Sequence, residues 1–148
     1  GSVDLRMTVE RDTRMPFLPR FGLRLMCPKS MNRVSYCGLG PLESYVDKRR
    51  ASWHGVFSGT PETLFEPYIK LGIYAAQPFD FQALPYTAEE MTAKAHNHEL
   101  EPSGSTVVCV DYMQSGIGSN SCGPELQARY RLDAERFTFN VLLRPEIG

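Results

Sequence analysis

The sequence predicts a mostly β protein, an antiparallel β-sandwich with one short helix near residues 88–96. Two observations lead to this fold class. Segments near both ends alternate between apolar and polar residues with a period of two, the pattern of half-buried strands. Between them, short apolar runs are separated by clusters of Pro, Gly, Ser and Asn, and many short strands with such turns are typical of a sandwich or barrel.

The first predicted strand is the segment 3–9, where Val3, Leu5 and Met7 alternate with polar residues. Its apolar side is expected to face the core. Shorter strand candidates follow, each bounded by turn residues. They are residues 21–26, 33–37, 55–58, 72–76 and 106–112.

The helix is predicted from a capping box. Thr87 is followed three residues later by Glu90, so each side chain can bind a free backbone amide of the first turn. We expect the helix to cover 88–96, with Met91 and Ala95 on one face, and to pack on a sheet.

The C-terminal region shows two further alternating runs, residues 126–132 and 137–143. Only four residues separate them. This spacing predicts an antiparallel hairpin with a short loop.

Length and charge limit the class of protein. At 148 residues the chain has the size of one domain, and we expect 1–148 to form a single β-sandwich. Lys and Arg number 16 against 17 Asp and Glu, which gives no basic excess for nucleic acid or an anionic membrane. We expect a soluble chain and favour the cytoplasm, with export of a full-length parent protein left open.

Four cysteines, Cys27, Cys37, Cys109 and Cys122, form no CxxC pair, which argues against a zinc ribbon or a thioredoxin-like site. Free thiols are expected at this low cysteine density. A Cys27–Cys37 disulfide across a hairpin is the alternative.

Six sequence blocks, in order and spread over nearly the whole chain, resemble the C-terminal, small-chain domain of glycoside hydrolase family 2 β-galactosidases. The resemblance implies a galactose mutarotase-like supersandwich that ends a multidomain enzyme hydrolysing terminal β-D-galactosides with retention. The blocks are LPRFGL (18–23), GLGPLESYVDKR (38–49), EPYI (66–69), FDF (79–81), HNHEL (96–100) and DYMQSGIGSNSCGP (111–124).

In this family a (β/α)₈ barrel supplies both catalytic glutamates and the magnesium ligands, and nothing here matches the barrel motifs. We therefore expect no catalytic residue, metal ligand or cofactor in this chain, and we expect the isolated chain to be inactive. Its expected partners are the preceding domains of its own polypeptide, with galactosides contacted only at the rim of the active site.

The family pattern is interrupted at one point. After Tyr68-Ile69, family members continue with Pro-Gln-Glu-Asn-Gly and a strand, whereas here Lys70 runs directly into Leu71. No turn residues separate the two segments. We interpret this as a missing segment between residues 70 and 71, on the order of a dozen residues or more.

The loop 116–124 is the candidate substrate-binding feature, because its glycines and small polar residues allow close approach to a ligand. The resemblance implies that the loop borders the active site, where family members place a tryptophan that supports substrate binding. Here Cys122 occupies that place and offers no stacking face. A plain turn between two core strands is the alternative. The candidate rim residues are Ser119, Asn120, Ser121 and Cys122.

Other polar groups have simpler interpretations. Glu89 and Glu90 fit the first turn of a helix better than an acid/base pair. Glu43 and Asp47 fit loop fixation. His96 and His98 are the best metal candidates by residue type, but no third ligand is near in sequence, and capping of a helix end explains them.

Aromatic residues leave a second function open. Trp53 can stack on a sugar, although an anchor in the core or between domains is the favoured interpretation, and Tyr36, Tyr45 and Tyr68 share this ambiguity. The leading hypothesis is a non-catalytic β-galactosidase domain that shapes the active-site rim and packs against other domains. An autonomous carbohydrate-binding module is the alternative, and a free-standing hydrolase is the third.

Overall fold

The computed structural model describes residues 3–41, 46, 49–63, 79–116 and 125–143. Strands dominate these ranges, with a single α-helix and three short 3₁₀ turns, η1 to η3. The elements are β1 (Val3–Glu10), β2 (Arg20–Pro28), β3 (Val34–Gly40), η1 (Arg49–Ala51), β4 (Trp53–Gly59), β5 (Asp80–Leu84), α1 (Ala88–Ala93), η2 (Asn97–Glu99), β6 (Ser105–Gln114), η3 (Ala128–Tyr130) and β7 (Arg136–Leu143).

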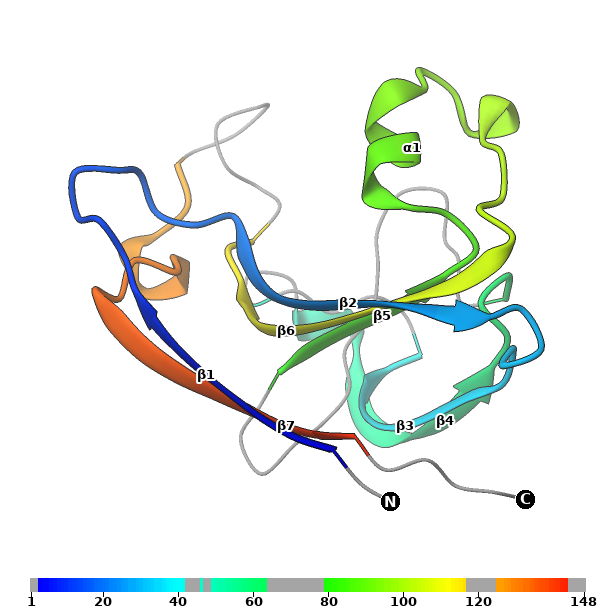
Figure 1. Cartoon of the computed structure of the whole chain (residues 1–148), viewed down its shortest axis with the longest axis horizontal. Helices are drawn as coiled ribbons and strands as arrows, with labels where there is room; N and C mark the ends of the chain where they lie inside the picture. The colour runs from blue at the N-terminus through cyan, green and yellow to red at the C-terminus, as the bar shows by residue number, and fades with distance from the viewer. Residues whose placement is uncertain (1–2, 42–45, 47–48, 64–78, 117–124, 144–148) are drawn as a thin grey trace.

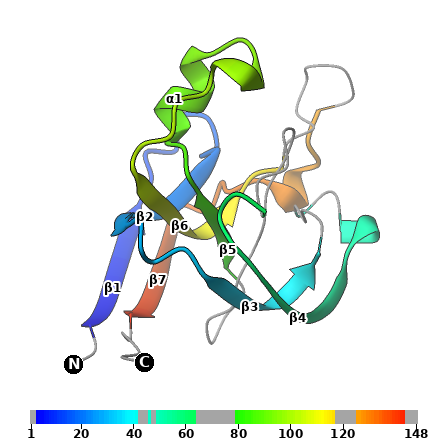
Figure 2. The same ribbon diagram turned by 90° about the vertical axis from the view of Figure 1, so that its right-hand side faces the viewer.

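All strand pairs are antiparallel, which confirms the predicted sandwich class. β2, β6 and β5 form a three-stranded sheet in that order, while β1 pairs with β7 and β3 pairs with β4. Figure 1 shows the three-stranded sheet above the two smaller ribbons, and α1 lies on its other side. In the turned view of Figure 2, α1 is again separated from the β1–β7 and β3–β4 ribbons.

The core lies between these layers. Its buried side chains come from β3, β5, β6 and β7, and Phe139 at its centre is fully buried. β1 adds Leu5 and Met7 from its apolar side, as its alternation predicts. Burial of such side chains is worth about 1.5–3 kcal/mol each, so this core is the main source of stability.

Most of the predicted strands are confirmed. The segments 3–9, 21–26, 33–37, 55–58 and 106–112 all lie in strands or overlap them, whereas the segment 72–76 lies outside the described residues. β5 was not predicted. It has only five residues, and the alternation Asp80-Phe81-Gln82-Ala83 is too short to stand out in the sequence as the longer runs do.

The predicted C-terminal hairpin is wrong. β7 pairs with β1 over eight residues, from Val3 opposite Leu143 to Glu10 opposite Arg136. Residues 126–132 instead contain η3, and Leu132 makes one isolated bridge to Leu18. Pairing with β1 places Phe139 and Val141 of β7 in the same core as Leu5 and Met7. Arg11 extends the contact beyond the strands, because its amide donates to Glu135 O and its guanidinium to Asp133 O.

The helix begins as predicted and ends earlier. Thr87 Oγ1 accepts a hydrogen bond from Glu90 N, but α1 ends at Ala93 and Lys94 is extended. A new capping box begins at His96, where Glu99 Oε2 accepts from the His96 amide, and η2 follows. Ala95 therefore does not share a helical face with Met91. No helix in the described ranges is long and apolar enough to cross a membrane.

The cysteines described by the structure, Cys27, Cys37 and Cys109, are free, and Cys122 lies outside the described residues. The alternative disulfide fails for a topological reason. Cys27 lies in β2 and Cys37 in β3, and these strands belong to different sheets rather than to one hairpin.

Candidate functional site

A polar cluster lies where β6 ends and the chain continues toward the loop 117–124. Asp80 on β5 and Asp111 on β6 are cross-strand partners, and Arg20 on β2 is opposite Gln114. The three strands of one sheet thus bring charged groups to the same end. A buried charge is costly unless it is paired and hydrogen-bonded, so the contacts among these groups matter for stability.

Asp111 and Arg20 form the central ion pair. The Asp111 carboxylate is 4% exposed and the Arg20 side chain 34%, and a guanidinium nitrogen donates to Asp111 Oδ2. Gln114 Nε2 donates to the same oxygen at 3.2 Å. Burial raises the pKa of Asp111, and the charge of Arg20 opposes that shift. The pair is therefore a buried, mutually dependent unit.

Gly22 makes room for this carboxylate. A β-bulge interrupts the β2–β6 register between Phe21 and Gly22. A Cβ atom at Gly22 would lie 2.3 Å from Asp111 Oδ1 and 2.3 Å from the carbonyl oxygen of Val110. Only glycine fits this close approach of backbone and carboxylate.

Asp80 is the second carboxyl of the cluster and is half-buried. Its Oδ2 accepts a hydrogen bond from Gln114 N at 2.8 Å. The pKa of Asp80 is raised to about 6, chiefly by burial; the Gln114 amide opposes this rise, and the neighbouring Asp111 adds to it. Arg49 and Arg20 act in the opposite direction. Asp80 thus titrates closer to neutrality than an ordinary aspartate.

Ser115 fixes the chain just beyond β6. Its amide donates to Pro19 O at 2.9 Å, and its Oγ donates to Leu18 O at 2.7 Å. The same Oγ accepts from Leu132 N at 2.9 Å. One serine therefore joins three segments that are distant in the sequence.

The chain is also held on the far side of the loop. Leu126 is buried, and the Arg131 guanidinium donates to its carbonyl oxygen from Nε at 2.9 Å and from a terminal nitrogen at 2.6 Å. Arg131 also pairs with Glu125 at 2.6 Å. The segments that precede and follow residues 117–124 are thus both anchored to the sandwich.

The predicted rim residues Ser119, Asn120, Ser121 and Cys122 lie outside the described residues. The same holds for the carboxylate pair Glu43 and Asp47 and for Tyr45 and Tyr68. Their roles stay predictions. What the structure adds is how the described segments before and after residues 117–124 are held.

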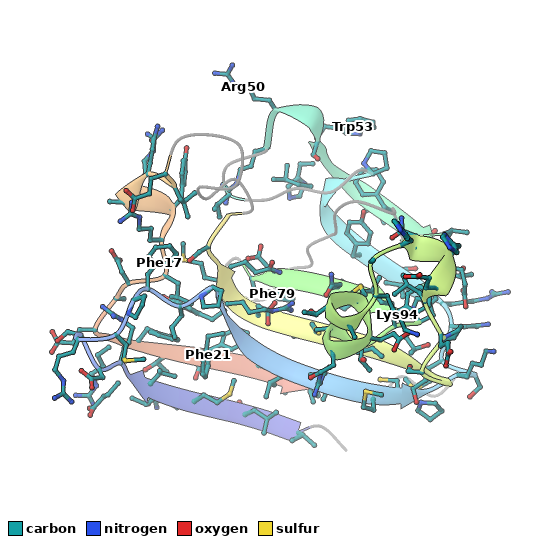
Figure 3. All side chains as sticks on the ribbon, turned by 90° about the horizontal axis from the view of Figure 1, so that it is seen from above. Phe17, Phe21, Arg50, Trp53, Phe79 and Lys94 are labelled. Atoms are coloured by element: carbon teal, nitrogen blue, oxygen red, sulfur yellow. The ribbon has the colours of Figure 1, made fainter. Side chains whose placement is uncertain are left out.

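Trp53 and Tyr36 do not form a shared platform. Trp53 is 60% exposed and Figure 3 shows it projecting from the ribbon, with its ring edge on Phe57 at 6.1 Å between centroids. Tyr36 is buried in the core. Stacking on a sugar by Trp53 would lack an aromatic partner in the described part of this face.

The histidine and glutamate candidates have structural roles. The rings of His96 and His98 stack at 5.4 Å, and no group of three His, Cys, Asp or Glu side chains suited to a metal ion occurs in the described ranges. Glu89 pairs with Arg24 on β2 at 2.6 Å. Glu90 Oε1 accepts from the Glu101 amide. The first contact links α1 to β2, and the second links the helix to the segment that follows it.

A small pocket lies away from the cluster, lined by residues that include Lys29, Glu62 and Tyr86. Its volume is about 100 Å³. Ligand pockets typically measure roughly 300–1,000 Å³, so it is too small to enclose a disaccharide.

Sequence analysis missed the polar cluster, although a signal was present. Its members come from four of the six blocks that carry the family resemblance. A charged residue in each block, with no local partner, was the available clue. The residues are Arg20, Arg49, Asp80, Asp111 and Gln114.

Comparison with known proteins identifies the relatives of this chain. Residues 1–143 match the family described as "Beta galactosidase small chain". The chain is 41% identical over 154 residues to a β-galactosidase of Actinobacillus pleuropneumoniae, with 93% of this chain and 15% of the relative covered. A Staphylococcus xylosus β-galactosidase is 35% identical over 165 residues, which cover 97% of this chain and 17% of the relative.

A separate small subunit is also similar. The "Beta-galactosidase small subunit" of Latilactobacillus sakei is 28% identical over 177 residues, with 95% of this chain and 55% of the subunit covered. The chain thus spans about one sixth of the two β-galactosidases and about half of the small subunit.

Proposed function

This chain belongs to the β-galactosidase small-chain family, and from that premise we propose that it is the non-catalytic C-terminal domain of a glycoside hydrolase family 2 β-galactosidase. The full-length polypeptide would hydrolyse terminal β-D-galactosides. This domain would shape the rim of the active site and pack against the other domains. The observation that carries the proposal is the family match over residues 1–143, combined with relatives roughly six times longer.

The carboxylates of the polar cluster support a non-catalytic role. Retaining hydrolysis needs two carboxyl groups about 5 Å apart on opposite sides of an accessible glycosidic bond. Asp111 is buried and bound by Arg20 and Gln114. Asp80, on the neighbouring strand, accepts a hydrogen bond from the Gln114 amide. Such an arrangement suits internal fixation rather than attack on a sugar.

We also propose that the magnesium ligands of the full-length enzyme lie outside this chain. Magnesium prefers several oxygen ligands in octahedral geometry, usually with bound water. The buried Asp111 carboxylate is already neutralised by Arg20, so it is a poor ligand for a second cation. The full-length enzyme would hold magnesium in its catalytic barrel.

We propose further that 1–148 is a single domain from which a segment is absent between Lys70 and Leu71. The alignment to the Actinobacillus enzyme extends over 154 residues while covering 93% of the 148 residues here, so the relative carries additional residues inside the matched region. Reading the genomic sequence across codons 70 and 71 tests this. An uninterrupted Lys-Leu junction would refute it.

The autonomous carbohydrate-binding module is the second candidate, and the exposed Trp53 is the observation that favours it. Isothermal titration of galactose and lactose into the purified chain separates the two functions. The rim-domain proposal predicts no binding heat and no turnover of o-nitrophenyl galactoside. Saturable binding without turnover would instead support the module, and a Trp53→Ala variant that abolished it would locate the site.

A further inference from the structure

The last residue of β6 is held by carboxylates from two strands. The Gln114 amide donates to Asp80 on β5, and the Gln114 side chain donates to Asp111 on β6 itself. Immediately afterwards, Ser115 is bound to Leu18 and Leu132. The path of the chain as it leaves the sheet is therefore set by a small number of hydrogen bonds.

Two of these hydrogen bonds involve a carboxylate, and they differ in their surroundings. Asp111, which accepts from the Gln114 side chain, is paired with Arg20, whereas Asp80 accepts from the Gln114 amide without an ion-pair partner in the described residues. Backbone amides bind an ionised carboxylate more strongly than a neutral carboxylic acid. The bonds of Ser115 involve a hydroxyl, amides and carbonyl groups, which do not titrate in the physiological range.

We propose that Asp80 is a positioning residue: its ionised carboxylate holds the Gln114 amide and thereby sets the direction in which the chain leaves β6 toward residues 117–124. This inference rests on the proposed function, in which this domain shapes the active-site rim, and on the prediction that residues 116–124 border that rim. It adds a regulation of the same site, because acid weakens the contact that Asp80 makes.

Burial and the charged groups around Asp80 bring its pKa into a range where the protonation change can be measured. Asp111 faces it from β6, Arg20 from β2 and Arg49 from η1. Burial dominates and raises the pKa of Asp80 to about 6, with the Gln114 hydrogen bond acting against it. The carboxyl group is thus mostly ionised at pH 7.5 and mostly protonated at pH 5.

Hydrogen exchange at the Gln114 amide tests the contact directly. The protein, expressed from its complete reading frame, would be compared at pH 5 and pH 7.5 after correction for intrinsic exchange. We expect the protection factor of this amide to be on the order of fivefold lower at pH 5. In Asp80→Asn it should be equally low at both pH values. Asp4→Asn, which removes an exposed carboxylate on β1, is the matched control and should behave as the wild type.

Equal wild-type protection at the two pH values would overturn the inference, and this comparison needs no variant to fold. KM for o-nitrophenyl galactoside is the second measurement. We expect Asp80→Asn to raise KM at pH 7.5 by about twofold to fivefold, with kcat unchanged. Altered protection with an unaltered KM would refute the rim assignment itself, whereas unaltered protection would refute only the role of Asp80.

Discussion

The residues of the polar cluster contribute unequally to the free energy of unfolding. The buried ion pair of Arg20 and Asp111 is expected to contribute most. Arg20→Met would leave the Asp111 carboxylate without its counter-charge. Removing one partner of a buried pair is costly, and because Arg20 is one third exposed we expect a loss of about 2–4 kcal/mol in the free energy of unfolding. Urea denaturation measures it.

A surface pair supplies the control for that substitution. Arg14 and Asp12 lie at 2.7 Å, but their side chains are 88% and 44% exposed. Arg14→Met should leave the denaturation midpoint unchanged, because water replaces the lost partner. Equal effects of the two substitutions would contradict the role assigned to Arg20.

Gly22 should be intolerant of a side chain. Gly22→Ala places a Cβ atom against backbone and carboxylate atoms at 2.3 Å, so we expect destabilisation of about 1–3 kcal/mol. Gly55→Ala is the milder comparison, since its added atom meets the Phe57 ring at 3.0 Å. A thermal melt in which Gly22→Ala matched the wild type would show that the bulge relaxes freely.

Asp80 also makes global stability depend on pH. Its pKa in the folded state, about 6, lies above the ordinary value of 3.8, so the folded protein binds this proton more tightly than the unfolded chain. The resulting stabilisation is fully present below about pH 4 and is lost as the pH rises through 6, with an upper bound of about 3 kcal/mol.

Urea denaturation at pH 4.5 and 7.5 measures this effect as the difference between wild type and Asp80→Asn. Relative to the variant, the wild type should lose stability as the pH rises. If the wild type instead became more stable relative to Asp80→Asn as the pH rose, the raised pKa of Asp80 would be contradicted. Acid is thus expected to stabilise the fold while weakening the Gln114 contact, which separates the global from the local effect.

Among the elements, α1 depends strongly on its cap because it is only six residues long. Thr87→Ala removes the acceptor of the Glu90 amide and should cost about 1 kcal/mol. Thr92→Ala is the control, because its exposed hydroxyl only bonds back to Ala88 O within the helix. Circular dichroism during denaturation compares the two, and equal losses would argue against the cap.

The elements also show what the sequence can and cannot predict. β1 and β7 were recognisable because each has one apolar side, and the Thr87 cap was recognisable because it is local. Their partners were not recognisable, since β7 pairs with β1, more than 120 positions away in the sequence, rather than with the neighbouring residues 126–132. The early end of α1 likewise follows from a second capping box at His96 that competes with the helix.

The candidate site follows the same rule. The family resemblance indicated the segments, yet it could not assemble Arg20, Asp80 and Asp111 into one cluster. That assembly depends on the order of β2, β6 and β5 in the sheet. Only the three-dimensional structure shows that Asp111 is buried and paired with Arg20 and that the half-buried Asp80 accepts the Gln114 amide, which favours fixation over catalysis.

For the whole molecule, we propose that this chain completes a galactosidase whose chemistry is performed elsewhere. Its family is shown by the match over residues 1–143, and its relatives extend far beyond the matched region. A polar cluster then anchors the base of the proposed rim loop. Substrate hydrolysis should therefore require residues beyond these 148.

The most direct test is the turnover of o-nitrophenyl galactoside by two proteins: the 148-residue chain and the polypeptide encoded by the complete reading frame. We predict that the complete polypeptide hydrolyses the substrate and that the 148-residue chain does not. Turnover by the chain alone would contradict the account, and so would a complete polypeptide that folds but leaves the galactoside intact.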